Sequence, residues 1–186
     1  MKLAVSDQIT LKAVGLDDVD DIFRTIDTQR DYLGEWLPFV TLTQSVDFTR
    51  SFIESLLETP YEVREHTFVM LYEGVFAGLV GLRDTDRANR KTEIGYWLSE
   101  PFQHKGIVTQ AVRSLLTFAF GELAMNRVQI RCAVGNTPSR SIPLHLGFQF
   151  EGVERAGELF PDGQYRDLEV YSMLKDELNK KTLFRS

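Results

Sequence analysis

The chain has 186 residues, of which 43% are hydrophobic and 26% are charged, and its formal net charge is −6. This composition is typical of a globular protein and disfavours a disordered or membrane protein. The length is usual for one domain, so we predict a single domain over residues 1–186. Because an acidic chain lacks the basic surface that neutralises phosphates, we expect no direct contact with nucleic acid.

Apolar runs and cysteine content indicate the compartment. The first ten residues lack the apolar stretch of a secretory signal, and no later run approaches the roughly 18 residues that span a bilayer. We therefore expect a cytoplasmic protein without a membrane partner. Cys132 is the single cysteine and lies in the apolar run VQIRCAV, which favours a buried side chain over a catalytic one. His66, His104 and His145 lack metal-ligand spacing, so no metal site is predicted.

Apolar periodicity predicts the elements of the first half of the chain. In order, they are a strand at 9–14, a helix after Asp17-Asp18, a short helix within 30–40, a helix over about 46–57, a hairpin within 66–84 and a strand at 92–99. The hairpin turn is expected at Glu73-Gly74, where glycine can take a positive φ.

The second half continues the alternation of strands and helices. It is predicted to contain a long helix over 105–120, a strand at 127–134, a short helix within 136–148 and two strands within 150–174. This order implies a mixed sheet with helices on its faces.

A polar turn separates the strand that ends near Leu98 from the long helix. It reads Gln103-His104-Lys105-Gly106-Ile107-Val108-Thr109. A helix N-terminus offers unpaired N–H groups and a partial positive charge, so it can hold a pyrophosphate, and Gly106 would let the backbone approach the phosphates. The segment matches neither a Walker loop nor GxGxxG, and a lone glycine at such a turn also occurs without any phosphate.

Three longer segments carry a family resemblance. EIGYWLSEPFQHKGIVTQAV (93–112), NRVQIRCAVGNTPSRSIPLHLGFQFEGVER (126–155) and GQYRDLEVYSML (163–174) resemble, in this order, the RimL/RimJ-type branch of the GNAT N-acetyltransferase superfamily. EWLPFV (35–40) also matches that branch, so the resemblance covers nearly the whole chain. It implies an α+β fold in three layers, with a mixed, mainly antiparallel central sheet and helices on both faces. It also implies acetyl transfer from acetyl-CoA to a primary amine, and it allows a homodimer.

The same resemblance assigns residues to the cofactor. The amides of the polar turn, formed by Gln103, His104, Lys105, Gly106, Ile107, Val108 and Thr109, would hold the CoA pyrophosphate. Tyr96, Trp97 and Leu98 would pair their backbone with the pantetheine arm, as an added strand in a splayed sheet, while the Tyr96 and Trp97 side chains pack in the core. Asn136 would hydrogen-bond the pantetheine, and Ser139 would lie near the thioester sulfur.

Two residues are implied in catalysis. Glu158 matches the proposed general base of this branch, and Ser139 would stabilise the leaving thiolate. A carboxylate can accept a proton from the attacking amine, and an α-amino group with a pKa near ~8 suits a weak base better than lysine near ~10.4. The residues alone equally allow Ser139 to cap a helix and Glu158 to be a solvated strand residue.

Two positions depart from the wider family, which often has Gly or Ala at Val108 and a tyrosine acid at Pro143. Proline cannot donate an N–H to the carbonyl of Ser139. We therefore expect the short helix either to begin near Ser141 or to be kinked, and both arrangements would displace Ser139.

The resemblance places Trp36 and Phe39, with the last hairpin and Glu158, at the acceptor entrance, although we expect at least one of the two aromatic side chains in the core. Three functions stay open. The acceptor is a protein N-terminal α-amine attacked directly in a ternary complex, or it is a small amine such as a polyamine or aminoglycoside, drawn by Asp31, Glu35 and Glu158. The third is a non-catalytic acetyl-CoA sensor.

Overall fold

An eight-stranded sheet forms the centre of the computed structural model, which describes residues 1–60 and 63–182, with side chains to residue 178. The spatial order is β1-β2-β3-β4-β5-β6-β8-β7, and β5 and β6 are the one parallel pair among these neighbours. The strands are β1 (Lys2–Ala4), β2 (Ile9–Ala13), β3 (His66–Tyr72), β4 (Val75–Asp86), β5 (Lys91–Leu98), β6 (Arg127–Ala133), β7 (Gln149–Leu159) and β8 (Tyr165–Leu174).

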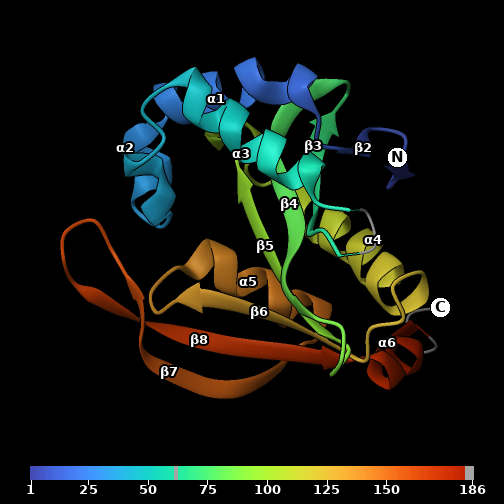
Figure 1. The fold of residues 1–186 in the computed structure, drawn as a ribbon. Coiled ribbons are helices and arrows are strands. Elements are labelled where there is room, and N and C mark those ends of the chain that lie inside the picture. Colours follow the sequence, from blue (N-terminus) through green and yellow to red (C-terminus); the bar gives the residue numbers. More distant parts are fainter. Residues whose placement is uncertain (61–62, 183–186) are drawn as a thin grey trace.

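Helices cover both faces of this sheet (Figure 1). The α-helices are α1 (Val19–Thr28), α2 (Arg30–Gly34), α3 (Val46–Glu58), α4 (Ile107–Gly121), α5 (Thr137–Leu146) and α6 (Lys175–Thr182), and the 3-10 turns are η1 (Leu16–Asp18), η2 (Pro38–Thr41) and η3 (Glu100–Phe102). The mixed, mainly antiparallel sheet between two helical layers confirms the predicted fold class.

Side chains of β3, β4 and β5 point alternately to the two faces of the sheet and so contribute to two separate hydrophobic cores. Phe68 and Met70 of β3 pack in the cluster that contains the apolar face of α4, whereas Val69 packs with α1 and α3 on the opposite face. Tyr96 and Trp97 of β5 divide in the same way. The period-two geometry of a strand therefore directs adjacent residues of one segment into different layers.

The predicted elements are confirmed, and two elements were missed. The hairpin turn lies at Glu73-Gly74, where both residues have a positive φ (51° and 81°). Strand β1 is a three-residue edge strand, too short for a periodic signal. Helix α6 has the sequence KDELNKKT, which has almost no apolar residues to give a helical period.

The sheet splits where β5 meets β6. The two strands pair over Lys91–Glu93 and Arg127–Gln129, and in the described chain their register ends there. Farther along, β5 continues to pair with β4 and β6 with β8, so the two strands diverge (Figure 1). Beyond Glu93 and Gln129 the two strands no longer pair, and their divergence forms a V in the sheet, here called the V-shaped opening, around which the candidate site lies.

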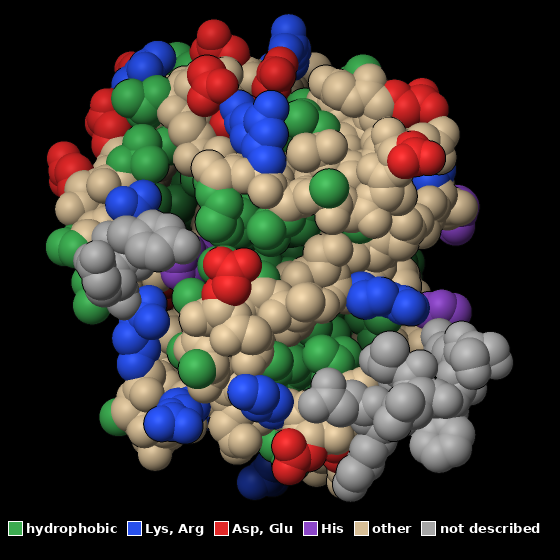
Figure 2. All heavy atoms as spheres, turned by 90° about the vertical axis from the view of Figure 1, so that its right-hand side faces the viewer, with side chains coloured by type: hydrophobic (Ala, Val, Ile, Leu, Met, Phe, Trp, Pro, Cys, Tyr) green, Lys and Arg blue, Asp and Glu red, His purple; other side chains and the backbone are tan. Residues whose placement is uncertain are grey.

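The surface agrees with the mixed composition. Figure 2 views the side that bears the N-terminal strands, where Lys and Arg side chains are interspersed with Asp and Glu. Among the described residues, no helix combines the length and apolar character needed to cross a membrane.

Candidate active site

The polar turn forms the N-terminal end of α4. Gly106 is the N-cap residue with a φ of 69°, and His104 has a φ of 61°, so the chain makes two left-handed turns just before the helix. Glycine is required at 106 by its backbone conformation, since an added Cβ would meet only the Gln110 amide, 3.6 Å away. Within the described chain, no side chain from the N-cap position bonds the first-turn amides. A helix N-terminus whose first-turn amides lack a side-chain partner is the kind of helix end that can bind an anion.

The side chains of the predicted turn divide by role. Ile107 and Val108 are buried in the core, so only their backbone could face a ligand. Gln103 Nε2 donates to the Tyr32 hydroxyl at 2.6 Å, which fastens the turn to α2. Lys105 Nζ lies 4.7 Å from the centroid of the Tyr72 ring, a cation–π contact that orients the ammonium group.

The edge of β5 beyond Glu93 includes the three residues predicted to pair with pantetheine. Tyr96, Trp97 and Leu98 retain their ladder with β4 on one side, while the other side faces the opening. The Trp97 side chain is buried in the α1–α3 core, as expected. The expectation of simple core packing for Tyr96 is incomplete, because its hydroxyl takes part in hydrogen bonds described below.

Helix α5 begins earlier than one expectation placed it. Its N-cap is Asn136, whose side-chain oxygen accepts the Ser139 N–H at 3.1 Å, and Pro138 lies in the first turn. The prediction of a start near Ser141 is therefore wrong. The alternative reading of Ser139 as the cap is also wrong, because Asn136 satisfies that donor and Ser139 lies in the first turn of the helix.

Pro143 lies inside α5 and leaves the Ser139 carbonyl without its helical donor. The Tyr96 hydroxyl, from β5, donates to that carbonyl at 3.0 Å. The Ser139 hydroxyl in turn donates to the Tyr96 oxygen at 3.3 Å. Burial raises the pKa of the Tyr96 phenol above its usual value, so the group stays protonated at neutral pH.

Cys132 lies on β6 near this pair, and it is buried as predicted. Burial raises the pKa of its thiol to about 11, with Glu169 acting in the same direction and a hydrogen bond to Ser139 opposing it. The thiol is therefore protonated at neutral pH, which makes it a poor nucleophile.

Glu158 lies near the end of β7, after an irregularity in the β7–β8 register between Glu154 and Glu158. Ala156 has a φ of 51° there, and its N–H is held by Asp167 at 2.8 Å. The Glu158 side chain is half-buried, which disfavours the reading of a solvated strand residue. Burial raises the pKa of its carboxyl, while Arg83 and Arg131 act in the opposite direction.

Sequence reasoning missed a buried charge cluster at the apex of the V. The Glu93 side chain is 1% exposed, and its carboxylate accepts bonds from Arg83 Nε (2.9 Å), Gln129 Nε2 (2.9 Å) and Arg131 Nε (2.5 Å). One signal was present in the sequence: a glutamate at a buried strand position, with arginines on the neighbouring predicted strands. The sequence could not show that these arginines contact Glu93, because the contacts depend on which strands are neighbours in the sheet.

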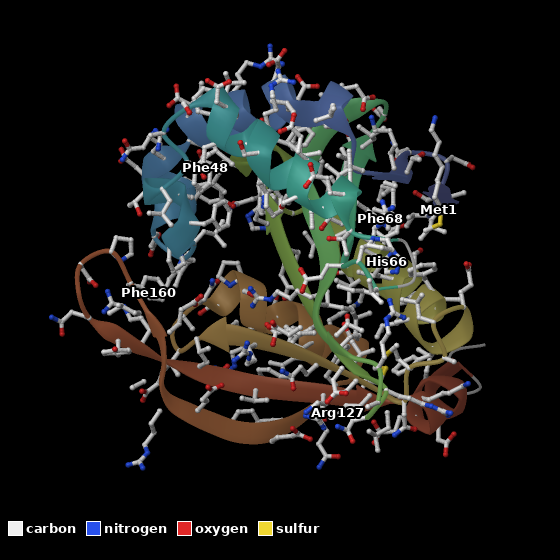
Figure 3. The ribbon with its side chains drawn as sticks, in the orientation of Figure 1. Met1, Phe48, His66, Phe68, Arg127 and Phe160 are labelled. Atoms are coloured by element: carbon white, nitrogen blue, oxygen red, sulfur yellow. The ribbon has the colours of Figure 1, made fainter. Side chains whose placement is uncertain are left out.

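Trp36 and Phe39 occupy different environments. Trp36 packs, half-buried, against a small cluster of Ala133, Phe160 and Leu168, and Phe39 is exposed. Trp36 therefore reaches from the segment after α2 to the C-terminal strands, and Figure 3 places Phe160 below α2 on the hairpin arm. The expectation that at least one of the two aromatic side chains lies in the core is met in part, since Trp36 packs, half-buried, against this small core cluster, whereas Phe39 does not.

The acids of the small-amine reading do not form one group. Asp31 lines a cavity of about 260 Å³ with Asp27 and Glu100, where α1 meets α2. The charged groups that act on Glu158 are Arg83, Arg131 and Glu93 instead. Among the described residues, no set of three His, Cys, Asp or Glu side chains is placed to hold a metal ion.

The fold, the split sheet and the turn before α4 define an acyltransferase of the GNAT type. The family model described as the acetyltransferase (GNAT) domain matches residues 8–149, so the chain belongs to this family, and it is an N-acetyltransferase. YdaF of Bacillus subtilis (strain 168), which carries the provisional name ribosomal N-acetyltransferase, is 39% identical over 93% of this chain and 94% of its own length.

Two further comparisons agree. The ribosomal-protein-serine acetyltransferase of Escherichia coli (strain K12) is 27% identical over 94% of this chain and 97% of its own length. The solved structure of the microcin C7 self-immunity acetyltransferase MccE in complex with acetyl-CoA and AMP has a TM-score of 0.85, with 29% identity over 91% of this chain and 94% of that one. The predicted resemblance to the ribosomal-protein branch is confirmed.

Proposed function

We propose that this protein transfers the acetyl group of acetyl-CoA to the N-terminal α-amine of a protein, by direct attack in a ternary complex. The observation that carries the proposal is the V-shaped opening: an unpaired edge of β5 runs from Glu93 toward the anion-binding end of α4. Such an opening accepts an extended, amide-containing chain that ends in phosphates. The acceptor class is supported by the names of the two ribosomal acetyltransferase relatives.

The residues around the opening fit the chemistry of CoA. The first-turn amides of α4, with Gly106 and His104 in left-handed conformations, suit the pyrophosphate. The backbone of Tyr96 to Leu98 suits the amides of the pantetheine arm, which would extend the sheet by one strand. Asn136 is proposed to donate a hydrogen bond to that arm from its side-chain nitrogen, because its side-chain oxygen already accepts the Ser139 N–H at the start of α5.

Glu158 is the proposed base. Burial raises the pKa of its carboxyl from the usual 4.5, while Arg83 and Arg131 oppose the rise, and above that raised pKa the group is a carboxylate. It can then accept a proton from an α-ammonium group or hold a water that does so. The amine attacks the thioester carbon, the C–S bond breaks as the new C–N bond forms, and the electron pair of the C–S bond leaves on sulfur. The second proton that the nitrogen loses passes to solvent or to the departing thiolate.

Ser139 is the proposed partner of the leaving sulfur. A thiol has a pKa near ~8.5, so its thiolate is a moderate base and one hydrogen bond is enough to stabilise it. The hydroxyl of Ser139 can turn from the Tyr96 oxygen, 3.3 Å away, toward that sulfur. The protonated thiol of Cys132 supports direct attack over an acyl-cysteine intermediate.

The test measures release of CoA from acetyl-CoA with a panel of N-terminal peptides, polyamines and aminoglycosides. We expect turnover on peptides that have a free α-amine, and none on the same peptides when the α-amine is blocked. Turnover confined to polyamines or aminoglycosides would replace the proposal with the small-amine alternative. Acetyl-CoA binding without turnover on any acceptor would support the sensor.

The base and the serine are tested in the same assay. Glu158→Gln and Ser139→Ala should each lower kcat by about 10²-fold, the scale of one acid–base group or one oxyanion contact. Matched controls are Glu54→Gln and Ser51→Ala on α3, both exposed and remote from the opening. A kcat for Glu158→Gln equal to that of Glu54→Gln would remove Glu158 from the mechanism.

A further inference from the structure

The Tyr96 hydroxyl replaces a hydrogen-bond donor that helix α5 lacks because of Pro143. In an α-helix the carbonyl of residue 139 accepts the N–H of residue 143, and proline has none. In this protein the donor comes from a different element, since the Tyr96 hydroxyl on β5 bonds the Ser139 carbonyl at 3.0 Å. A strand of one half of the V is thereby joined to the first turn of the helix on the other half.

The same phenol also bonds the Ser139 side chain. The Ser139 hydroxyl donates to the Tyr96 oxygen at 3.3 Å, so one phenolic oxygen donates to the backbone of Ser139 and accepts from its side chain. The third polar group of Ser139, its N–H, is held by Asn136 at 3.1 Å. Every polar group of this serine therefore has a partner at rest, which fixes its backbone and orients its hydroxyl before the reaction.

We propose that Tyr96 is a positioning residue for Ser139: it replaces the amide that Pro143 lacks and so fixes the Ser139 backbone, and it accepts the serine hydroxyl at rest, in a direction from which that hydroxyl can turn to the leaving sulfur. The inference rests on the proposed function, in which Ser139 stabilises the thiolate. Tyr96 itself keeps its proton throughout. It acts through Ser139, and it links the presence of proline at 143 to the presence of a phenol on β5.

If Tyr96 only stabilised the helix, Pro143→Ala would restore both the stability and the activity that Tyr96→Phe loses. Alanine at 143 restores an N–H that can donate to the Ser139 carbonyl, so it repairs the backbone defect left by Tyr96→Phe. It cannot restore the acceptor for the Ser139 hydroxyl. The two roles of the phenol are thus separated by one substitution on the helix.

The experiment compares the wild type, Tyr96→Phe, Pro143→Ala and the double variant, by thermal unfolding and by steady-state kinetics on an accepted peptide. We expect Tyr96→Phe to lower Tm and to lower kcat by about tenfold, the rate equivalent of ~1.4 kcal/mol. KM for acetyl-CoA should change little. In the Pro143→Ala background, Tyr96→Phe should lower Tm less than it does in the wild type, while kcat stays low. Tyr171→Phe, which removes a phenol bonded to Glu169 at 2.8 Å, is the matched control and should keep kcat.

A second cycle uses Ser139→Ala. Once the serine hydroxyl is absent, Tyr96→Phe should reduce kcat no further, since the phenol has nothing left to position. Recovery of kcat together with Tm in the Tyr96→Phe/Pro143→Ala variant, additive losses in the second cycle, or an unchanged kcat in Tyr96→Phe would each overturn the inference. A wild type inactive on every amine would instead refute the proposed function, and with it the catalytic part of the inference.

Discussion

Glu93 and Gln129 are the last facing residues at which β5 and β6 pair, and the Gln129 amide donates to the Glu93 carboxylate at 2.9 Å. The same carboxylate binds Arg83 from β4 and Arg131 from β6. The apex of the opening is therefore fixed by side chains of three strands. Beyond it, the divergence of the strands exposes the backbone edge that the proposed function requires.

Removing the Glu93 carboxylate should destabilise the fold. Glu93→Ala leaves the Arg83 and Arg131 guanidinium groups without their shared buried partner, which costs about 3 kcal/mol; this is the low end of the range for a broken buried pair, because the Arg83 side chain is half-exposed. Urea unfolding measures the loss. Glu54→Gln on the surface should stay within about 0.5 kcal/mol of wild type. An equally small change for Glu93→Ala would show that the cluster adds no stability.

The pH dependence of activity should report Glu158. Because burial raises the pKa of its carboxyl above 4.5, kcat/KM should rise as pH increases through that raised pKa. Glu158→Gln should abolish this rise of kcat/KM at acidic pH, while any change of kcat/KM at alkaline pH that comes from ionisation of the acceptor amine should remain. A rise that persists unchanged in Glu158→Gln would assign the ionisation to another group.

The raised pKa of Glu158 also predicts that Glu158→Gln stabilises the folded protein. A carboxyl with a raised folded-state pKa binds its proton more tightly in the folded protein, so its contribution is complete below the unfolded value and is lost as pH rises through the raised pKa. Above the raised pKa the ionised Glu158 therefore carries a burial cost that Glu158→Gln removes. We expect a higher Tm for Glu158→Gln at pH 7 and a smaller difference at pH 4.

Acid stability should depend on Glu151 with the opposite sign. A bidentate bond from Arg127 (2.6 and 2.5 Å), aided by Ser172, lowers the pKa of the Glu151 carboxyl to about 2. Its stabilising contribution is present above the unfolded value of 4.5 and is lost as pH falls toward 2. Tm measured from pH 6 to pH 2 should fall less steeply in Glu151→Gln than in wild type. Parallel curves would contradict the assignment.

Replacing Gly106 should weaken acetyl-CoA binding more than it lowers the stability of the fold. Gly106→Ala places a Cβ at a φ of 69°, which costs about 1 kcal/mol of stability and favours a different turn. Gly74→Ala is the matched control, because its φ of 81° imposes the same backbone cost in a hairpin turn with no atom within 4 Å of the added Cβ. Calorimetric titration with acetyl-CoA should show weaker binding for Gly106→Ala alone. Equal affinities would place the pyrophosphate elsewhere.

The sequence by itself determined the family and most of the elements, all but the short strand β1 and the polar helix α6 among the strands and α-helices. Apolar periods of two and 3.6 residues are local properties, so the hairpin at Glu73-Gly74 and the long helix after Gly106 could be placed from their letters. The polar turn is also contiguous, so the start of α4 directly after Gly106 could be placed without any knowledge of the sheet.

Tertiary structure decided how distant groups meet. The cluster at Glu93 needs β4, β5 and β6 to be neighbours, and the bond from Tyr96 to Ser139 joins residues 43 positions apart. Pro143 illustrates the limit best: the local rule correctly found the lost helical donor, but it could not find the phenol that replaces it. Which polar group fills a local vacancy is set by packing between elements, and no periodicity in the sequence records that choice.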